Sequence, residues 1–274
     1  MATRTTLLGL AKPDYSDVQD VGVINGNMEI IDKEIGKRTR AHNLLDNSDF
    51  TDPVNQEDET SYTGQGLYTI DRWKQEYNGS TVTVGDNGLT VAPGASVQGW
   101  ISQYYAKPLK AGAIVTAYIK LANGTENVFA ITLNESTIYL QGNGYIVGIS
   151  TEKFDLVVNA GDPSVTFEKV ALYEGEYNSD TVPTYQPKGY SAELTACLLW
   201  RRYIYRVFGS PVGNLSREAI ILDPPMKDVP EVKETSLWKG SEDAGYTVQA
   251  AEKRYVDMQY TGWGSVSLIL TCEP

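Results

Sequence analysis

The stretch Ile114-Val-Thr-Ala-Tyr-Ile-Lys-Leu121 alternates between residues suited to a core and residues suited to a sheet surface. A period of two is typical of a strand that buries one face. Similar runs, rich in Val, Ile, Thr and Tyr, recur from Tyr68 to about Gly175, and Gly, Asn, Asp and Pro separate them. The clearest of these runs are Ser80–Val84, Gly88–Val91, Val128–Leu133 and Ser164–Phe167. We therefore predict a two-sheet sandwich of jelly-roll type with roughly eight to ten strands, and a closed barrel is the alternative.

Turn-forming residues lie between these runs. Asp86-Asn87-Gly88 and Asn123-Gly124 are tight-turn signals. The spacing of Gly142, Gly144 and Gly148 also favours hairpin turns, because no helical pattern follows that would make it a phosphate-binding loop.

Upstream of the β region, Val21 to Ile35 has a helical period. Its apolar residues recur at spacings of three and four, which is a heptad seam, and polar residues fill the positions between them. β-Branched residues at both seam positions favour a parallel trimer over a dimer. An amphipathic helix that lies on the chain's own domain is the alternative. The predicted oligomerisation residues are Val21, Ile24, Met28, Ile31 and Ile35.

Downstream, the proline-rich linker Thr181–Pro187 precedes a helix that Ser191 can cap, with Glu193 in its first turn. β-Structure then follows, and the last strand places Val266, Leu268, Leu270 and Cys272 on one face. The fold class is therefore mainly β, with an N-terminal heptad helix, a jelly-roll sandwich and a C-terminal β-rich head that begins with one helix. The predicted domains are residues 1–42, 43–180 and 181–274.

Composition and charge narrow the functional classes. The net charge of the 274 residues is −12, which argues against a nucleic-acid partner. The N-terminal apolar run is too short for a signal peptide and no window resembles a membrane span, so we expect neither secretion through a leader nor membrane insertion. Cys197 and Cys272 fit free thiols better than a disulfide framework.

Few residues of the chain are candidates for catalysis. His42 is the single histidine, so histidine-dependent triads and sites with several histidine ligands are excluded. A carboxylate pair for glycoside cleavage stays open among 35 acidic residues, although their clustering in the loop Thr51–Thr60 favours a solvated surface. That loop could instead hold a structural Ca²⁺. We expect no enzyme activity and no other cofactor or metal.

Aromatic residues are the remaining candidates for binding. The chain has 18 Tyr and 5 Trp against 5 Phe, so amphipathic rings outnumber plain core filler. Such rings suit stacking on sugars as well as subunit interfaces. Trp73 is predicted to lie in the core. The candidate ligand-binding residues are Trp100 and Tyr104 in one strand of the sandwich, and Trp238, Tyr246, Tyr255, Tyr260 and Trp263 in the head, where Trp263 is expected at a loop tip.

Several short segments, taken in their order along the chain, resemble the tail-fibre and receptor-binding proteins of bacteriophages and prophages of Gram-positive and gut bacteria. The matching segments are Leu8–Tyr15, Val23–Met28, Asn43–Phe50, Asp71–Trp73, Tyr185–Lys188, Glu193–Cys197, Arg201–Tyr203 and Pro225–Pro230.

This resemblance implies a homotrimeric virion protein, made in the host bacterial cytoplasm. Its N-terminal segment would attach to other tail, baseplate or capsid proteins, its middle module would resemble carbohydrate-binding jelly rolls, and its head would recognise a host cell-surface glycan. The segment Arg217–Thr247 departs from the pattern, so no ligand surface carries over. A capsid-decorating head fibre and a polysaccharide-degrading tail enzyme are the alternatives.

Overall fold

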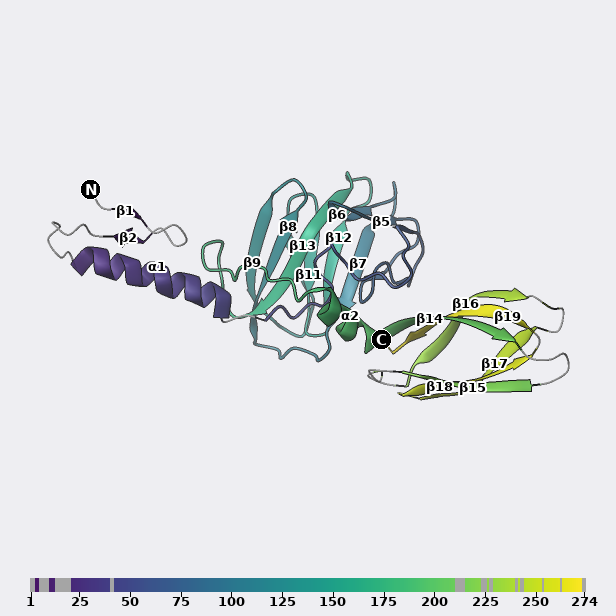
Figure 1. Cartoon of the computed structure of the whole chain (residues 1–274). Coiled ribbons are helices and arrows are strands. Elements are labelled where there is room, and N and C mark those ends of the chain that lie inside the picture. The colour runs from purple at the N-terminus through teal and green to yellow at the C-terminus, as the bar shows by residue number, and fades with distance from the viewer. Residues whose placement is uncertain are drawn as a thin grey trace.

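The computed structural model describes residues 3–4, 10–12, 21–39, 42–209, 215–222, 226, 229–239, 241, 244–252, 254–261 and 263–272. The structure is 46% strand and 9% helical, which confirms the prediction of a mainly β fold. Figure 1 shows three parts in a row, namely a helix with a small hairpin, a β-sandwich and a smaller β-rich head. The helix and the head lie at opposite ends of the molecule.

The N-terminal part contains helix α1 (Val21–Thr39) and the antiparallel pair β1 (Thr3–Arg4) and β2 (Ala11–Lys12). The Asn27 side chain holds β2 on the helix, because its amide accepts from the Ala11 N–H and donates to the Ala11 carbonyl, both at 2.9 Å. Among the helices of the described residues, none is long and apolar enough to cross a membrane.

Helix α1 occupies the segment where the seam is predicted. Ile24 is 49% exposed and Met28 is 62% exposed, whereas Ile31 is half-buried. The side chains of Val21 and Ile35 lie outside the described residues. At least this part of the stripe is therefore not covered by the chain's own domains, and its pairing with other copies stays a prediction.

The middle part consists of two antiparallel sheets. The first has the order β3 (Ser61–Tyr62), β5 (Thr81–Gly85), β6 (Gly88–Ala92), β13 (Val165–Glu174), β8 (Ile114–Leu121) and β9 (Glu126–Thr132). The second has the order β10 (Ile138–Gln141), β11 (Ile146–Ile149), β12 (Lys153–Val158), β7 (Gly99–Tyr104) and β4 (Lys74–Gln75). Apolar side chains from both sheets meet in one core, so the two sheets form a sandwich.

Trp73 lies in this core, as predicted, and is fully buried. Its ring makes edge contacts with Phe50 and Phe154, with centroid distances of 5.1 and 6.3 Å. Its indole N–H donates to the Asn47 carbonyl at 2.9 Å, so the one polar atom of the ring is satisfied.

The turn predictions at glycine residues are confirmed at some positions and wrong at another. Gly88 has a φ of +117°, and a Cβ atom there would lie 2.0 Å from the Phe167 carbonyl oxygen, so the turn before β6 requires glycine. The Gly142 N–H donates to the Tyr145 carbonyl at 2.8 Å, which closes the predicted turn between β10 and β11. The prediction of a turn at Gly148 is wrong, because Gly148 lies inside β11.

The head contains two three-stranded antiparallel sheets. Their orders are β14 (Arg201–Gly209), β19 (Trp263–Thr271) and β16 (Glu231–Lys239), and β15 (Leu215–Ile221), β18 (Tyr255–Thr261) and β17 (Gly245–Glu252). Val266, Leu268 and Leu270 are buried between them and Cys272 packs against the same cluster, as predicted. Cys197 and Cys272 are both free thiols, as predicted.

Helix α2 (Tyr190–Leu198) connects the sandwich to the head. The prediction that Ser191 caps this helix is wrong. The helix begins two residues earlier than a Ser191 cap would place it, at Tyr190, and its N-cap is Gly189, whose φ of +80° turns the chain into the helix without a side-chain cap. Ser191 therefore lies inside the first turn.

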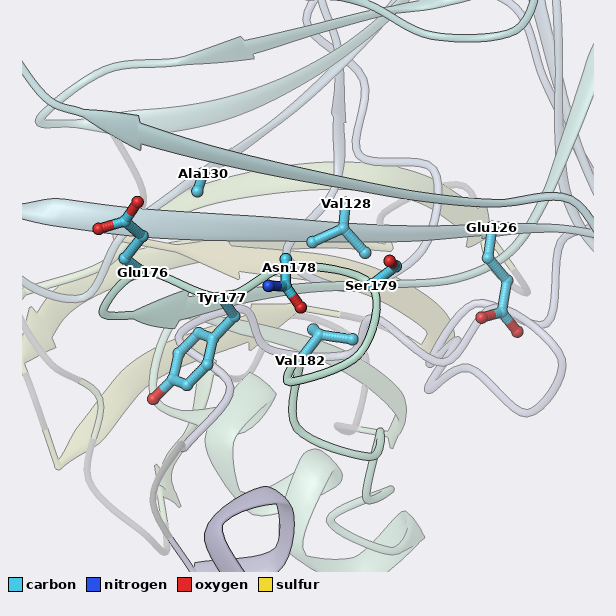
Figure 2. Close-up of a pocket in the computed structure, with 8 residues that line it drawn as sticks. All are labelled: Glu126, Val128, Ala130, Glu176, Tyr177, Asn178, Ser179 and Val182. Carbon is cyan, nitrogen blue, oxygen red and sulfur yellow. The ribbon is translucent and has the colours of Figure 1, made fainter. Parts of the chain in front are cut away.

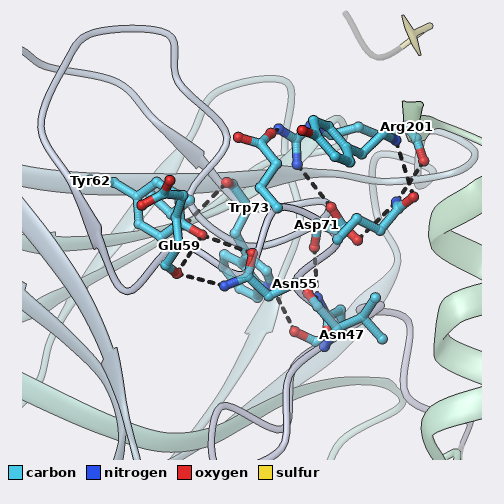
Figure 3. Close-up of polar contacts among 12 residues, drawn as sticks. Asn47, Asn55, Glu59, Tyr62, Asp71, Trp73 and Arg201 are labelled. Carbon is cyan, nitrogen blue, oxygen red and sulfur yellow. Dashed lines mark hydrogen bonds and ion pairs between the residues drawn. The ribbon is translucent and has the colours of Figure 1, made fainter. Parts of the chain in front are cut away.

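The junction between sandwich and head is polar (Figure 3). Arg201, at the start of β14, donates from Nη1 to Asp71 Oδ1 at 2.8 Å and pairs through Nη2 with Glu57. Glu193 of α2 accepts a hydrogen bond from the Asn47 N–H at 2.8 Å. Glu57 of the acidic loop Thr51–Thr60 thus forms an ion pair with the head. Within the described ranges, no group of three or more His, Cys, Asp or Glu residues could hold a metal ion.

Candidate functional site

The two outer faces of the sandwich differ in how far other parts of the chain cover them. On the six-stranded sheet, Tyr118 and Tyr173 are buried, because the linker after β13 packs over them through Tyr177, Val182 and Tyr185. Figure 2 shows the linker residues beside β9, around a hollow of about 600 Å³ with Glu126 and Glu176 at its opposite ends. These tyrosines are therefore used for packing within the chain.

The outer face of the five-stranded sheet carries rings that are open to solvent. Tyr139 of β10 is 55% exposed, Tyr77 after β4 is 41% exposed, and Trp100 of β7 is half-buried between them. The centroid of Trp100 lies 5.4 Å from that of Tyr77 and 6.4 Å from that of Tyr139. Tyr104 lies on the same face of β7 as Trp100, because residues at even spacing in a strand share a face. We call Tyr77, Trp100, Tyr104 and Tyr139 the aromatic face.

Gly148 makes room for this arrangement. In the strand register Gly148 lies between Tyr139 of β10 and Asp155 of β12. A Cβ atom at Gly148 would lie 3.0 Å from the Tyr139 ring and 3.0 Å from the Asp155 side chain. The missing side chain therefore lets the Tyr139 ring lie over β11.

Buried polar atoms lie beneath the rings. Asp155 is fully buried, and its Oδ1 accepts from the Ser102 hydroxyl at 2.6 Å and pairs with Lys153 at 3.1 Å. Three further buried atoms have no hydrogen-bond partner among the described residues, namely Asp155 Oδ2, Glu76 Oε1 and Trp100 Nε1. An unsatisfied buried group costs about 1–3 kcal/mol. Because these atoms are buried, a ligand on this face would contact the rings above them.

Two lysines set the charge of the face. The Lys153 Nζ atom lies 5.2 Å from the Trp100 ring and 5.9 Å from the Tyr104 ring, and Lys74 Nζ lies 5.7 Å from the Tyr104 ring. Burial lowers the pKa of Lys153, but the charge of Asp155, the hydrogen bond to Asp155 and the charge of Glu76 together outweigh burial, and the pKa is raised. Lys153 therefore stays protonated and holds the two rings through cation–π contacts.

The candidate residues of the head differ in accessibility. Tyr260 is 3% exposed, and its hydroxyl donates to the Met258 sulfur at 3.7 Å, so its ring belongs to the head core and is not open to a ligand. Tyr246 is half-buried against the same core, and Tyr255 is 36% exposed. The prediction of a loop tip at Trp263 is wrong, because Trp263 is the first residue of β19 and pairs with Gly209 of β14. The side chains of Trp263 and Trp238 lie outside the described residues.

The structure thus brings Trp100 and Tyr104 together and adds Tyr77 and Tyr139, which the sequence does not single out. No sequence signal links these two tyrosines to Trp100, because only the strand order places β4 and β10 in the same sheet as β7. The burial of Tyr260 could have been predicted from the sequence. Val256, Met258 and Tyr260 lie at every second position of one strand and so share its buried face.

The aromatic face combines flat apolar rings with polar atoms at their edges. This combination suits a pyranose ring, whose C–H groups stack on an aromatic ring while its hydroxyl groups donate and accept hydrogen bonds. Comparisons of the chain with known protein families, with curated proteins and with solved structures find no match. What the chain binds is therefore inferred from the chemistry of this face.

Proposed function

We propose that the chain is a virion structural protein of a bacteriophage, a homotrimeric tail fibre or receptor-binding protein that attaches the particle to a host cell-surface glycan. One observation carries the sugar-binding part of the proposal: the half-buried Trp100 lies in a row between the exposed rings of Tyr77 and Tyr139 on an outer face of the sandwich. On the opposite outer face, comparable tyrosines are covered by the chain. The sandwich, rather than the head, is the proposed reader of the glycan.

The course of the chain supports a jelly roll for this module. The chain changes from one sheet to the other six times between β3 and β13, and every strand pair is antiparallel. Such alternation between two packed sheets is typical of jelly rolls. Jelly rolls host many functions, so the fold by itself carries no ligand, and the sugar depends on the aromatic face.

The N-terminal helix supports the proposal that the chain forms a homotrimer. Ile24 and Met28 of α1 are exposed apolar residues at heptad spacing, and a parallel trimer would bury them. The helix extends from the end of the molecule opposite the head (Figure 1), where attachment to a tail, baseplate or capsid leaves the sandwich accessible. Three weak sites on one particle bind far more strongly than one site.

The test is binding to bacterial walls. Purified wild-type chain and the Tyr139→Ala variant are compared on isolated walls of Gram-positive and gut bacteria, with Tyr190→Ala as the matched control because Tyr190 is also an exposed tyrosine, at 51%. We expect Tyr139→Ala to bind about tenfold more weakly while the control binds normally. Equal binding by both variants would refute the aromatic face as the contact surface. We propose binding without cleavage, and release of reducing ends from the walls would favour a polysaccharide-degrading enzyme instead.

A further inference from the structure

A second hollow, of about 620 Å³, lies at the junction between the sandwich and the head. Its sandwich wall contains Tyr62, Leu67 and Tyr68, of which Leu67 is 37% exposed. Its head wall comes from the sheet β14-β19-β16 and from Arg201 at the start of β14. We call this hollow the junction cleft.

The head wall is one face of a sheet. Glu231 and Lys233 alternate along β16, and they lie opposite Thr271 and Ile269 of β19 in the strand register. Residues at this spacing point to the same side, so all four side chains line the cleft. Glu231 and Lys233 are exposed, and a ligand in the cleft can reach them.

The junction cleft continues the aromatic face. Lys74 lines the cleft, and its Nζ atom lies 6.0 Å from the Tyr68 ring and 5.7 Å from the Tyr104 ring. On the cleft side, the Arg201 guanidinium lies 5.4 Å from the Tyr68 ring. Tyr68 therefore connects the two surfaces, and a chain-like ligand that crosses the sheet towards β4 reaches the cleft next.

The path across the sheet to the cleft is longer than a small sugar. From β10 to β4 there are four strand spacings in the sheet, and at about 4.8 Å each they give about 19 Å before the cleft begins. A ligand in contact with both Tyr139 and Lys233 must be a polymer of several sugars.

The charges of the cleft favour a neutral ligand. Lys74, Arg201 and Lys233 are balanced by three glutamates, Glu57, Glu59 and Glu231. The whole chain has a net charge of −12, which repels a polyanion. Hydroxyl groups can pair with both signs of charge, and among these six residues Glu59, Glu231 and Lys233 are exposed.

We infer that the aromatic face and the junction cleft form one continuous site for an extended neutral polysaccharide, contacted by sandwich and head together. This inference rests on the proposed function. It also gives the head a part in recognition, through Lys233 and Glu231.

The experiment uses the neutral polysaccharide fraction of walls that the chain binds, cut by partial acid hydrolysis into a ladder of chain lengths. Affinities are measured by calorimetry for wild type, for Tyr139→Ala and for the cleft variant Leu67→Ala with Lys233→Ala. Lys239→Ala is the matched control, because Lys239 is an exposed lysine at the far end of the same strand.

We expect the cleft variant to bind short oligosaccharides as wild type does and to bind long ones about tenfold more weakly. Tyr139→Ala weakens both, and Lys239→Ala weakens neither. Equal affinity of wild type and cleft variant for long chains would overturn the inference while leaving the proposed function intact. Binding of wild type to an anionic wall polymer in preference to the neutral fraction would overturn the neutral class. No binding of wild type to any wall fraction would defeat the proposed function, and the inference with it.

Discussion

Arg201, the first residue of the head, forms an ion pair with Asp71 of the sandwich, with 2.8 Å between Nη1 and Oδ1. Asp71 is fully buried and the Arg201 side chain is 5% exposed, so this pair is shielded from solvent. Gln56 donates from its side chain to Asp71 Oδ2 and to the Arg201 carbonyl, both at 2.9 Å. The two modules are thus joined by a small polar network whose members depend on one another.

Removing one partner of this ion pair should destabilise the folded protein. Asp71→Ala leaves the Arg201 charge with less compensation in a buried site, and we expect a loss of about 3–5 kcal/mol in the free energy of unfolding. The double variant Asp71→Ala with Arg201→Met removes both charges and should lose less than Asp71→Ala. Urea unfolding followed by fluorescence measures both, with the exposed Asp162→Ala as the control. A single variant within 1 kcal/mol of wild type would contradict a structural role for the pair.

A methyl group at Gly148 should disturb both the aromatic face and the buried Asp155 beside it. The new Cβ atom would lie 3.0 Å from the exposed Tyr139 ring and 3.0 Å from the side chain of Asp155, which is fully buried. We expect Gly148→Ala to weaken binding to walls several-fold, because Tyr139 loses its position, and to lower the melting temperature, because the buried Asp155 side chain must shift.

The matched control for Gly148→Ala is Gly85→Ala at the end of β5, where an added Cβ meets nothing within 4 Å. It should leave both binding and melting unchanged. Normal wall binding by Gly148→Ala would show that the position of Tyr139 is unimportant for the ligand.

The carboxyl group of Glu193 should make stability depend on pH. Burial raises its pKa, although the hydrogen bond from Asn47 acts in the opposite direction. A raised folded-state pKa means that the folded protein holds this proton more tightly than the unfolded chain does. The stabilising contribution is complete below about pH 4.3, the ordinary pKa of a glutamate, and is lost as pH rises through the raised value.

Glu193→Gln removes this titration while its amide oxygen can still accept from Asn47. The melting temperature of wild type minus that of the variant should fall as pH rises from about 4.3 towards neutral. A difference that stays constant across this range would show that Glu193 has the same pKa in the folded and unfolded states.

A charge in the α1 seam should dissociate the proposed trimer. Ile24→Asp with Ile31→Asp places carboxylates where three helices would meet, and light scattering should then report the mass of a monomer. Asn25→Asp adds the same charge at an exposed position between the seam residues and should leave the mass unchanged. A wild-type chain that is itself monomeric at micromolar concentration would remove the trimer from the proposal.

Local periodicity was enough to predict several elements. The run Ile114–Leu121 corresponds to β8 with the same bounds, but the prediction of one buried face is wrong there, because residues 115–119 are all buried. The alternation in the last strand correctly placed Leu268 and Leu270 in the head core. The three-four spacing from Val21 correctly predicted a helix. Each of these patterns is visible within one segment, because a strand or helix repeats its buried side at a fixed period.

The aromatic face was decided by tertiary structure. Trp100 was a candidate from its strand alone, but its neighbours Tyr77 and Tyr139 reach it only through the sheet order β10-β11-β12-β7-β4. Gly148 shows the same limit, since a glycine in a sequence is typical of a turn, whereas here it leaves space for a ring from the next strand. The residues of one chain segment determine which of its sides is buried, but which distant segment lies against that side depends on strand pairing and register across the whole domain.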